Sequence, residues 1–220
     1  MSDEEIAIFQ ALLLGWYDKN KRSFPWRYTF DPYKVFVSEI LLQQTNVEKV
    51  INPYIKIVNE YKNIHQLSEA DNVILREIFK SIGLFYRADR MINISKEIVS
   101  KHNGNIPDTW DYLIKIKGIG RYICSAILCF GYNKPYAILD TNVIRVFDRV
   151  LGIMTTQSRA REDVRLWSIA QMILPENDYI DFNYAILDFA SSVCTAKSPK
   201  CRECPFKFMC FFEDKISIDT

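Results

Sequence analysis

The stretch Ile-Lys-Gly-Ile-Gly-Arg at residues 116–121 places two glycines directly in front of a helical pattern. Within that pattern Ile123, Ile127 and Phe130 recur at steps of four and three residues, as side chains do on one face of an α-helix. Glycines just before a helix let the N–H groups of its first turn approach an anion closely. The sequence therefore predicts a helix that begins after Gly120 and carries an anion-binding turn.

Helical patterns extend through the rest of the chain. Apolar residues from Val47 to Val58 recur at steps of three and four residues and predict a second amphipathic helix. Runs of alternating β-branched residues between turn signals, which would indicate strands, are absent from the sequence. The 220 residues are 49% hydrophobic and 25% charged, so the chain can bury a substantial core. We therefore predict an all-α globular protein.

The sequence shows no sign of membrane insertion or secretion. Apolar runs fall short of the eighteen or more residues of a membrane helix, and the N-terminus is acidic where a secretory signal would be basic. We expect a cytoplasmic protein. The net charge of +1 does not by itself indicate nucleic-acid binding, because phosphate-binding proteins usually carry a basic excess. Basic residues do cluster at 19–27 and 197–207, although such clusters are usually solvated surface.

Four of the six cysteines lie within seventeen residues, in the spacing C-x6-C-x2-C-x5-C. Disulfides are rare in the cytoplasm, and four thiols this close suit one tetrahedral metal centre. Four thiolates can hold either Zn²⁺ or an iron–sulfur cluster, so the ligand type leaves both open. The four predicted ligands are Cys194, Cys201, Cys204 and Cys210.

These features together resemble the helix-hairpin-helix DNA glycosylases of the endonuclease III and MutY superfamily. The resemblance rests on the cysteine spacing, the two-glycine stretch and Asp140, which follows twenty residues after Gly120. The segments Phe24–Arg27 and Ser38–Thr45 resemble the opening of MutY adenine glycosylases, and the likeness runs to Cys210. It implies a [4Fe–4S] cluster on the four cysteines, double-stranded DNA with a mismatched or damaged base as partner, and cleavage of the N-glycosidic bond.

The resemblance also implies a domain organisation. Residues 23–133 would form a helical barrel module with the helix-hairpin-helix. Residues 1–22 and 134–220 would form a cluster module, with the [4Fe–4S] loop at 194–210. DNA would bind in the cleft between the modules. We expect a monomer associated with the nucleoid.

Four residues match the catalytic groups of the superfamily. Glu39 matches an acid that protonates the leaving base, and Asp140 matches a carboxylate that stabilises the sugar cation. Tyr122 and Asn142 match groups that organise this carboxylate and the nucleophilic water. A nearby anion is useful because cleavage develops an oxocarbenium-like sugar. The alternatives are that Asp140 caps a helix beginning at Thr141 and that Glu39 forms a buried salt bridge.

Position 122 distinguishes two mechanisms. Relatives that also nick the backbone carry a lysine at this position, and its amine forms a Schiff base with the sugar. The phenol of Tyr122 cannot do so. We therefore expect a monofunctional glycosylase that leaves an abasic site.

Further residues match positions that contact the base or the duplex. Trp26 and Arg27 match the lining of the base pocket, and Gln44, next to Gln43, matches a residue inserted into the duplex. Trp26 and Tyr122 could also be core aromatics, and the two glutamines could be surface amides. The hairpin and the segment between the first two cysteines supply the predicted phosphate contacts, Gly118, Gly120, Arg121, Lys197 and Lys200.

Two bases are candidates for removal. Adenine opposite G or 8-oxoG is favoured by Gln43 and Gln44, but MutY enzymes usually have Gly at the position of Thr141 and a further C-terminal domain, whereas this chain ends at Thr220. Archaeal-type thymine mismatch glycosylases, which remove T or U opposite G, are compact and have the tyrosine, but tend to have basic residues in place of the glutamines. We predict adenine, with thymine or uracil as the alternative.

A non-enzymatic function is the remaining alternative. A cluster-bearing DNA-binding protein could keep the hairpin and the cysteines only as a platform. Such a platform has no use for a pair of acids, so the joint presence of Glu39 and Asp140 argues for an enzyme.

Overall fold

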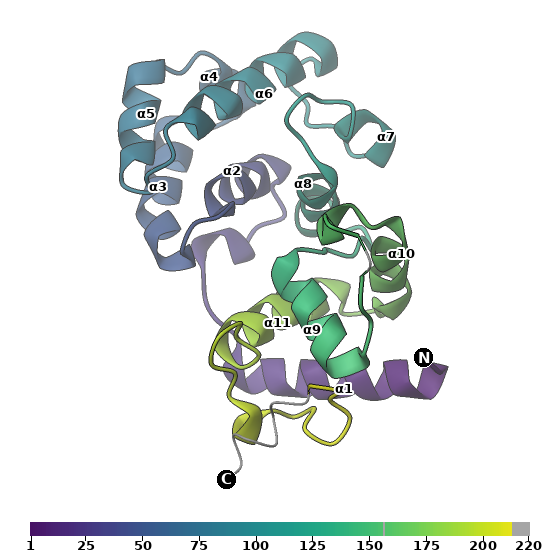
Figure 1. Ribbon diagram of the computed structural model, residues 1–220. Coiled ribbons are helices and arrows are strands. Elements are labelled where there is room, and N and C mark those ends of the chain that lie inside the picture. Colours follow the sequence, from purple (N-terminus) through teal and green to yellow (C-terminus); the bar gives the residue numbers. More distant parts are fainter. Residues whose placement is uncertain (156, 213–220) are drawn as a thin grey trace. The chain divides into compact units, whose positions relative to one another are not determined.

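The computed structural model describes residues 1–155 and 157–212, and these form helices joined by turns and loops, without a strand (Figure 1). The prediction of an all-α fold is confirmed. The chain divides into two compact units. Unit 1 comprises Met1–Arg22 with Pro135–Thr220, and unit 2 comprises Ser23–Lys134. No helix among the described residues is both long and apolar enough to cross a membrane.

Unit 2 is built around α2 (Pro32–Leu42), of whose eleven residues eight are buried. Asp31 caps this helix by accepting a hydrogen bond from Tyr33 N at 2.9 Å, and Pro32 takes the first helical position, where a missing N–H has no cost. A helix that is apolar all round requires cover on several faces. The other elements of unit 2 are η1 (Pro25–Arg27), α3 (Val47–Glu60), α4 (Ile64–Ser68), α5 (Asn72–Lys80), α6 (Tyr86–His102), α7 (Trp110–Leu113), α8 (Arg121–Ala126) and η2 (Ile127–Gly131), and of these η1, α3, α6, α8 and η2 pack against α2.

The helix predicted after Gly120 is present but changes its winding. Regular α8 gives way to a π-helical turn in η2, which accommodates one more residue per turn. The predicted apolar face is buried along both segments. A Cβ atom on Gly131 would lie 2.8 Å from Cα of Pro32, so only a glycine lets η2 approach the start of α2 this closely.

Unit 1 joins the N-terminal helix to the second half of the chain. Its core is aromatic: the ring of Phe9 stacks on Phe206 with centroids 4.9 Å apart and meets Phe182 edge-on at 6.2 Å. Phe206 lies between the last two cysteines, so its burial anchors their loop to the core. The elements of unit 1 are α1 (Asp3–Asn20), α9 (Thr141–Leu151), η3 (Ala160–Glu162), α10 (Val164–Ile173), α11 (Tyr179–Ser192) and η4 (Cys201–Glu203).

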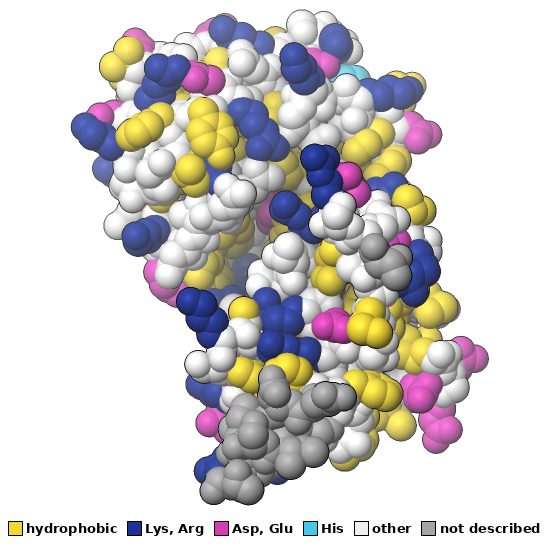
Figure 2. Space-filling view, viewed as in Figure 1, with side chains coloured by type: hydrophobic (Ala, Val, Ile, Leu, Met, Phe, Trp, Pro, Cys, Tyr) yellow, Lys and Arg dark blue, Asp and Glu magenta, His cyan; other side chains and the backbone are white. Residues whose placement is uncertain are grey.

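The surface carries both signs of charge, in keeping with the small net charge. Figure 2 shows Lys and Arg side chains interspersed with Asp and Glu. Acidic side chains gather at the beginning of α1, where Asp3, Glu4 and Glu5 occupy the first turn and Ser2 forms a capping box with Glu5. Acidic residues are favourable at this end of a helix because its dipole is positive there.

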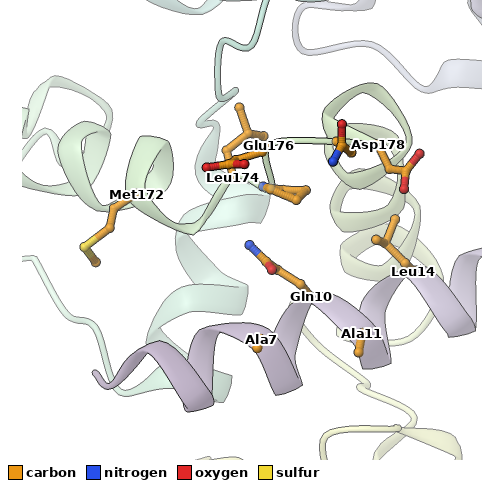
Figure 3. A pocket seen from close by; sticks show the side chains of 10 residues that line it. Ala7, Gln10, Ala11, Leu14, Met172, Leu174, Glu176 and Asp178 are labelled. Atoms are coloured by element: carbon orange, nitrogen blue, oxygen red, sulfur yellow. The ribbon is translucent and has the colours of Figure 1, made fainter.

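A cavity of about 520 Å³ opens in unit 1 between α1 and the turn that joins α10 to α11 (Figure 3). Gln10 spans it by donating a hydrogen bond from Nε2 to the carbonyl oxygen of Ile173 at 2.8 Å. Figure 3 shows apolar Ala7, Ala11 and Leu14 on the α1 side. None of the residues predicted to form the functional site lines this cavity.

Candidate active site

Asp140 stands at the N-terminus of α9 in unit 1 and is held there by three hydrogen bonds. Its Oδ1 accepts from the backbone N–H groups of Asn142 and Val143, both at 2.8 Å, and its Oδ2 accepts from Asn142 Nδ2 at 2.7 Å. The helix-cap alternative therefore describes the geometry correctly. An ionised carboxylate offers about four acceptor positions, so one on Oδ2 is not used by the cap. Capping and catalysis are compatible for this half-buried side chain.

Arg145 connects this carboxylate to the cysteine loop, residues 194–210. Its Nη1 donates to Asn142 Oδ1 at 3.1 Å, and its Nε donates to the carbonyl oxygen of Cys194 at 2.9 Å. A third bond runs from Nη2 to the carbonyl of Ala190 at 2.8 Å. The planar fork of an arginine suits such a bridge. Through it, the predicted catalytic carboxylate and the first predicted metal ligand share one hydrogen-bonded network.

Arg149, one turn further along α9, holds the same loop from its other side. Its guanidinium donates to the carbonyls of Thr195 at 2.7 Å and Ala196 at 3.1 Å. Its own carbonyl accepts from Cys210 Sγ at 3.0 Å and from Phe211 N at 2.7 Å. Both ends of the cysteine loop are therefore fastened to a single residue of the helix that Asp140 begins.

The four predicted ligands line one cavity of about 20 Å³. Among the described residues, no group of three or more His, Cys, Asp or Glu side chains converges on a position for a metal ion. The shared cavity and the set of four thiols nevertheless fit a thiolate-bound centre chemically. Burial raises the pKa of the Cys204 thiol to about 12, and it also raises the pKa of Cys194 although Arg149 partly counteracts this. A metal binds the thiolate form of cysteine, so metal binding at these buried thiols would release their protons.

Glu39 and Tyr122 belong to unit 2. Glu39 lies on α2 and is only 4% exposed. Tyr122 is the second residue of α8 and is partly buried, and α8 packs against α2. The structure thus places Glu39 and Tyr122 on contacting helices of one unit, and Asp140 and Asn142 side by side in the other unit.

The predicted base-pocket residues occupy η1. Trp26 is buried, stacks on Phe24 with centroids 5.1 Å apart, and meets Tyr54 edge-on at 5.3 Å. The guanidinium of Arg27 lies 5.0 Å from the centroid of the Phe24 ring. Trp26 therefore has the surroundings of the core aromatic that was its alternative interpretation.

The predicted hairpin is present at residues 116–120. Gly118 has a φ of +101°, which L side chains rarely adopt, and Gly120 precedes the first residue of α8. The guanidinium of Arg121 lies 5.8 Å from the centroid of the Trp110 ring. The turn at Gly118 and Gly120 therefore leads directly into α8, and this helix begins after Gly120 as the sequence predicted.

The remaining predicted DNA contacts lie on two loops. Gln43 is half-buried and Gln44 is exposed in the loop after α2, and Gln44 has a φ of 53°, an unusual conformation for a residue other than glycine. Lys197 and Lys200 are both exposed on the cysteine loop, where the Lys200 N–H donates to the carbonyl of Val193 at 2.9 Å. Both loops present polar side chains to solvent.

Sequence reasoning did not find the arginines that hold the cysteine loop. Arg145 and Arg149 follow Asn142 at steps of three and four residues, so they share one face of α9. That spacing was the only available signal. It does not say which distant carbonyls the face would meet.

Comparison with known proteins identifies the family. Residues 37–171 match the family described as HhH-GPD superfamily base excision DNA repair protein. The chain belongs to this family. It is a DNA glycosylase of base excision repair that acts on DNA.

The chain is similar to HhH-GPD enzymes of two specificities. It is 34% identical to a thymine-DNA glycosylase of Aeropyrum pernix, over 94% of this chain and 95% of that protein. It is 33% identical to an adenine DNA glycosylase of Buchnera aphidicola, over 92% of this chain and 58% of that protein. Among solved structures, a thermostable thymine-DNA glycosylase aligns with a TM-score of 0.87 at 27% identity, over 97% of this chain and 98% of that one. The HhH-GPD fold is thereby confirmed.

Proposed function

We propose that this glycosylase removes thymine or uracil mispaired with guanine from double-stranded DNA, without nicking the backbone. The observation that carries the proposal is the match to thymine-DNA glycosylases along almost the whole of both chains. Thr141, in place of the glycine usual in MutY enzymes, agrees with it. This order of preference is the reverse of the one that Gln43 and Gln44 suggested from the sequence.

In the proposed reaction, the carboxylate of Asp140 stabilises the positive charge that develops on the sugar. Its three hydrogen bonds fix its position before the reaction begins, so little reorganisation is needed as charge develops. Asn142 orients it directly, and the unused acceptor position on Oδ2 can receive a hydrogen bond from the attacking water. Thymine or uracil can leave as a resonance-stabilised anion, so the reaction does not depend on protonation of the base.

Unit 2 carries the remaining candidate residues for the reaction. Glu39 and Tyr122 would contribute from unit 2, with Trp26 and Arg27 shaping the pocket for the extruded base. An extruded base is required because the bond to be cleaved is not accessible inside the duplex. In this proposal the hairpin residues Gly118, Gly120 and Arg121, together with Lys197 and Lys200 of the cysteine loop, bind phosphates.

We further propose that Cys194, Cys201, Cys204 and Cys210 hold a [4Fe–4S] cluster, as their shared cavity and thiol chemistry allow. When bound, the cluster would supply a rigid crosslink of the loop and no chemistry at the glycosidic bond. Arg149 and Phe206 already fasten the loop to unit 1, and the bound form would keep Lys197 and Lys200 at a fixed distance from α9.

The decisive experiment is a panel of duplexes containing T·G, U·G, A·G, A·8-oxoG and matched pairs. After single-turnover incubation, each sample is divided, and one half is treated with alkali to break abasic sites. We expect strand breaks in the T·G and U·G duplexes only, and only after alkali. Borohydride should trap no covalent complex, because Tyr122 cannot form a Schiff base. Release of adenine but not of thymine or uracil would contradict the proposed substrate and show that the enzyme removes mispaired adenine.

Adenine remains the second candidate because of one observation. Glu39 is a buried acid on the helix that leads to Gln43 and Gln44, and a positioned acid is what departure of a purine requires. A second Buchnera aphidicola relative, named adenine DNA glycosylase, is 34% identical to the chain over 92% of its length. The same duplex panel decides between the two bases.

A further inference from the structure

One face of α6 carries four side chains that contact two functional loops of unit 2. Arg87, Arg90, Ile94 and Glu97 follow each other at steps of three, four and three residues, so they lie along one stripe of the helix. The loops they meet are the α2 loop, residues 42–46, and the hairpin turn around Gly118. Since both loops bond to this stripe, α6 is their shared support.

Arg90 contacts both loops at once. Its Nη1 donates to Gln43 Oε1 at 2.6 Å, and its Nε donates to the carbonyl oxygen of Gly118 at 3.2 Å, where Nη2 also donates. The guanidinium has five N–H donors in a rigid plane, so one side chain can satisfy acceptors on two segments. A shorter or single-headed cation could not hold both in the same geometry.

The neighbouring residues of the stripe reinforce this arrangement. Arg87 donates from Nη1 to Thr45 Oγ1 at 3.0 Å, at the end of the α2 loop. Glu97 accepts a hydrogen bond from the N–H of Lys117 at 3.1 Å, next to the hairpin glycine. A Cβ atom on Gly118 would lie 3.0 Å from Ile94 Cδ1, so the turn lies directly against the helix. The α2 loop and the hairpin turn are thus mounted on one rigid element.

The charge of Arg90 is not neutralised by an acid among the described residues. Among the described residues, Arg90 donates hydrogen bonds to neutral amide and carbonyl oxygens. Burial, together with the nearby charge of Arg87, lowers the pKa of Arg90. Arg87 is itself only 1% exposed. Two partly or wholly buried cations side by side are costly for the folded protein, and such groups are concentrated at functional sites. A nearby phosphate backbone would relieve this cost.

The contact with Arg90 also fixes what Gln43 can offer a ligand. Because its side-chain oxygen accepts from Arg90, its NH₂ group is the part left to bind elsewhere. The edges of all base pairs present acceptors in the minor groove, to which an amide NH₂ can donate. Gln44 follows in a left-handed conformation, at a φ of 53°, which persists only where the surroundings impose it.

We propose that Arg90 is a positioning residue that ties the α2 loop to the hairpin turn and thereby sets the preference of the enzyme for mispaired over matched duplex. The inference rests on the proposed function, in which both loops contact DNA. While Arg90 bonds to both loops, the hairpin binds the DNA backbone and the α2 loop contacts the base pair at a fixed position relative to the hairpin. At this fixed position the α2 loop can open a mispair more readily than a matched pair, because unpairing a mispair costs less free energy.

The test compares Arg90→Met with Arg90→Lys and with the control Arg76→Met. Arg76 forms an exposed, two-bond ion pair with Asp89 in the same unit, so its replacement removes a similar interaction away from both loops. Binding is measured by anisotropy in an Asp140→Asn background, on a T·G duplex and on its T·A counterpart. We expect Arg90→Met to reduce the ratio of the two affinities about tenfold, while Arg76→Met leaves it unchanged. Arg90→Lys should bind the matched T·A duplex with normal affinity but lose most of the preference for the T·G duplex.

A double-mutant cycle with Gln43→Leu makes the inference specific. If Arg90 acts by holding Gln43, the effect of Arg90→Met on the ratio should be much smaller in the Gln43→Leu protein. A 2-aminopurine placed beside the mispair should brighten on binding of the parent but not of Arg90→Met. Additive effects, or equal losses on both duplexes, would overturn the inference. If Arg90→Met does not fold, an unchanged ratio in Arg90→Lys and Gln43→Leu overturns it equally.

Failure of the proposed function would look different. The binding ratio and the fluorescence signal need no turnover, whereas the duplex panel measures base release alone. Absence of base release with a normal binding ratio would refute the glycosylase specificity and leave the role of Arg90 intact.

Discussion

Asp140 and Glu39, the two carboxyl groups predicted to act in catalysis, are held in opposite ways. Asp140 is half-buried at a helix end, and all three of its hydrogen bonds come from residues two or three positions away. Glu39 lies in the middle of an apolar helix and is nearly inaccessible. The first arrangement suits a carboxylate that must remain an anion, and the second suits a group that can carry a proton. Local sequence alone builds the first site, whereas the second depends on the packing of a whole unit.

The largest effect should come from the cysteine loop, which supports the Asp140 side of this comparison. If it holds a structural metal centre, the binding free energy is also folding free energy, about 10 kcal/mol or more in comparable zinc sites. We expect the purified protein to be yellow-brown and to contain about four irons and four sulfides per chain, the composition of a [4Fe–4S] cluster. Cys201→Ser should lose the iron and lower the melting temperature strongly.

The matched control is Cys124→Ala, which removes a buried cysteine outside the loop and should leave the iron content unchanged. A colourless protein with one zinc per chain would refute the cluster while keeping the metal site. A protein without any metal, equally stable after Cys201→Ser, would refute both.

The next largest effect is expected for Asp140→Asn. Asparagine is also a good helix cap, so the substitution removes the charge and keeps the cap. Base release should fall by on the order of 10²–10³-fold, because the charge is needed when the sugar cation develops. Affinity for duplex and the melting temperature should change little. Single-turnover base release and thermal unfolding measure the two effects separately.

Asp71→Asn is the control for this substitution. Asp71 caps α5 with the same pattern, accepting from Val73 N at 2.7 Å and Ile74 N at 3.3 Å. It should retain full activity. Equal activity of Asp140→Asn and the parent would leave Asp140 as a helix cap and nothing more.

The two carboxyl groups also illustrate which features could be predicted from the sequence: those set by neighbouring residues could, and those set by distant contacts could not. The helices, the hairpin and the Asp140 cap were predictable because each depends on residues a few positions apart. The bridges made by Arg90 and Arg145 were not, since they join residues 28 to 49 positions apart. Periodicity shows which face of a helix is occupied, but it does not identify the backbone carbonyls that this face will meet. The π-helical turn of η2 was also missed, and its last residue, Gly131, lies against Pro32 at the start of another helix.

A smaller effect is expected for Arg145, which bonds both to Asn142, three residues away, and to the distant Cys194. Its replacement by Met breaks the chain of hydrogen bonds from Asn142 to Cys194 but leaves the cap of Asp140 in place. We expect base release to fall about tenfold, the usual scale for hydrogen bonds of a charged group, with unchanged affinity for duplex. Arg145→Lys should restore part of the rate. Arg165→Met, which removes an exposed arginine that bonds the Met154 carbonyl, is the control.

The smallest effect should be that of Glu39→Gln, and it tests the other half of the comparison. If thymine or uracil is the substrate, the base leaves as an anion, so loss of the acid should cost less than about tenfold in single-turnover release from T·G duplex. If adenine is the substrate, departure depends on protonation of the ring, and the same change should cost on the order of 10²–10⁴-fold on an A-containing mismatch. The pH profile should agree with the rates. An enzyme that uses protonated Glu39 loses activity as rising pH removes this proton, and Glu39→Gln abolishes that decline, whereas the pyrimidine enzyme shows no such limb in either protein. A large loss on T·G duplex together with the basic limb would mean that Glu39 protonates the leaving pyrimidine, and the proposed independence from base protonation would then be wrong.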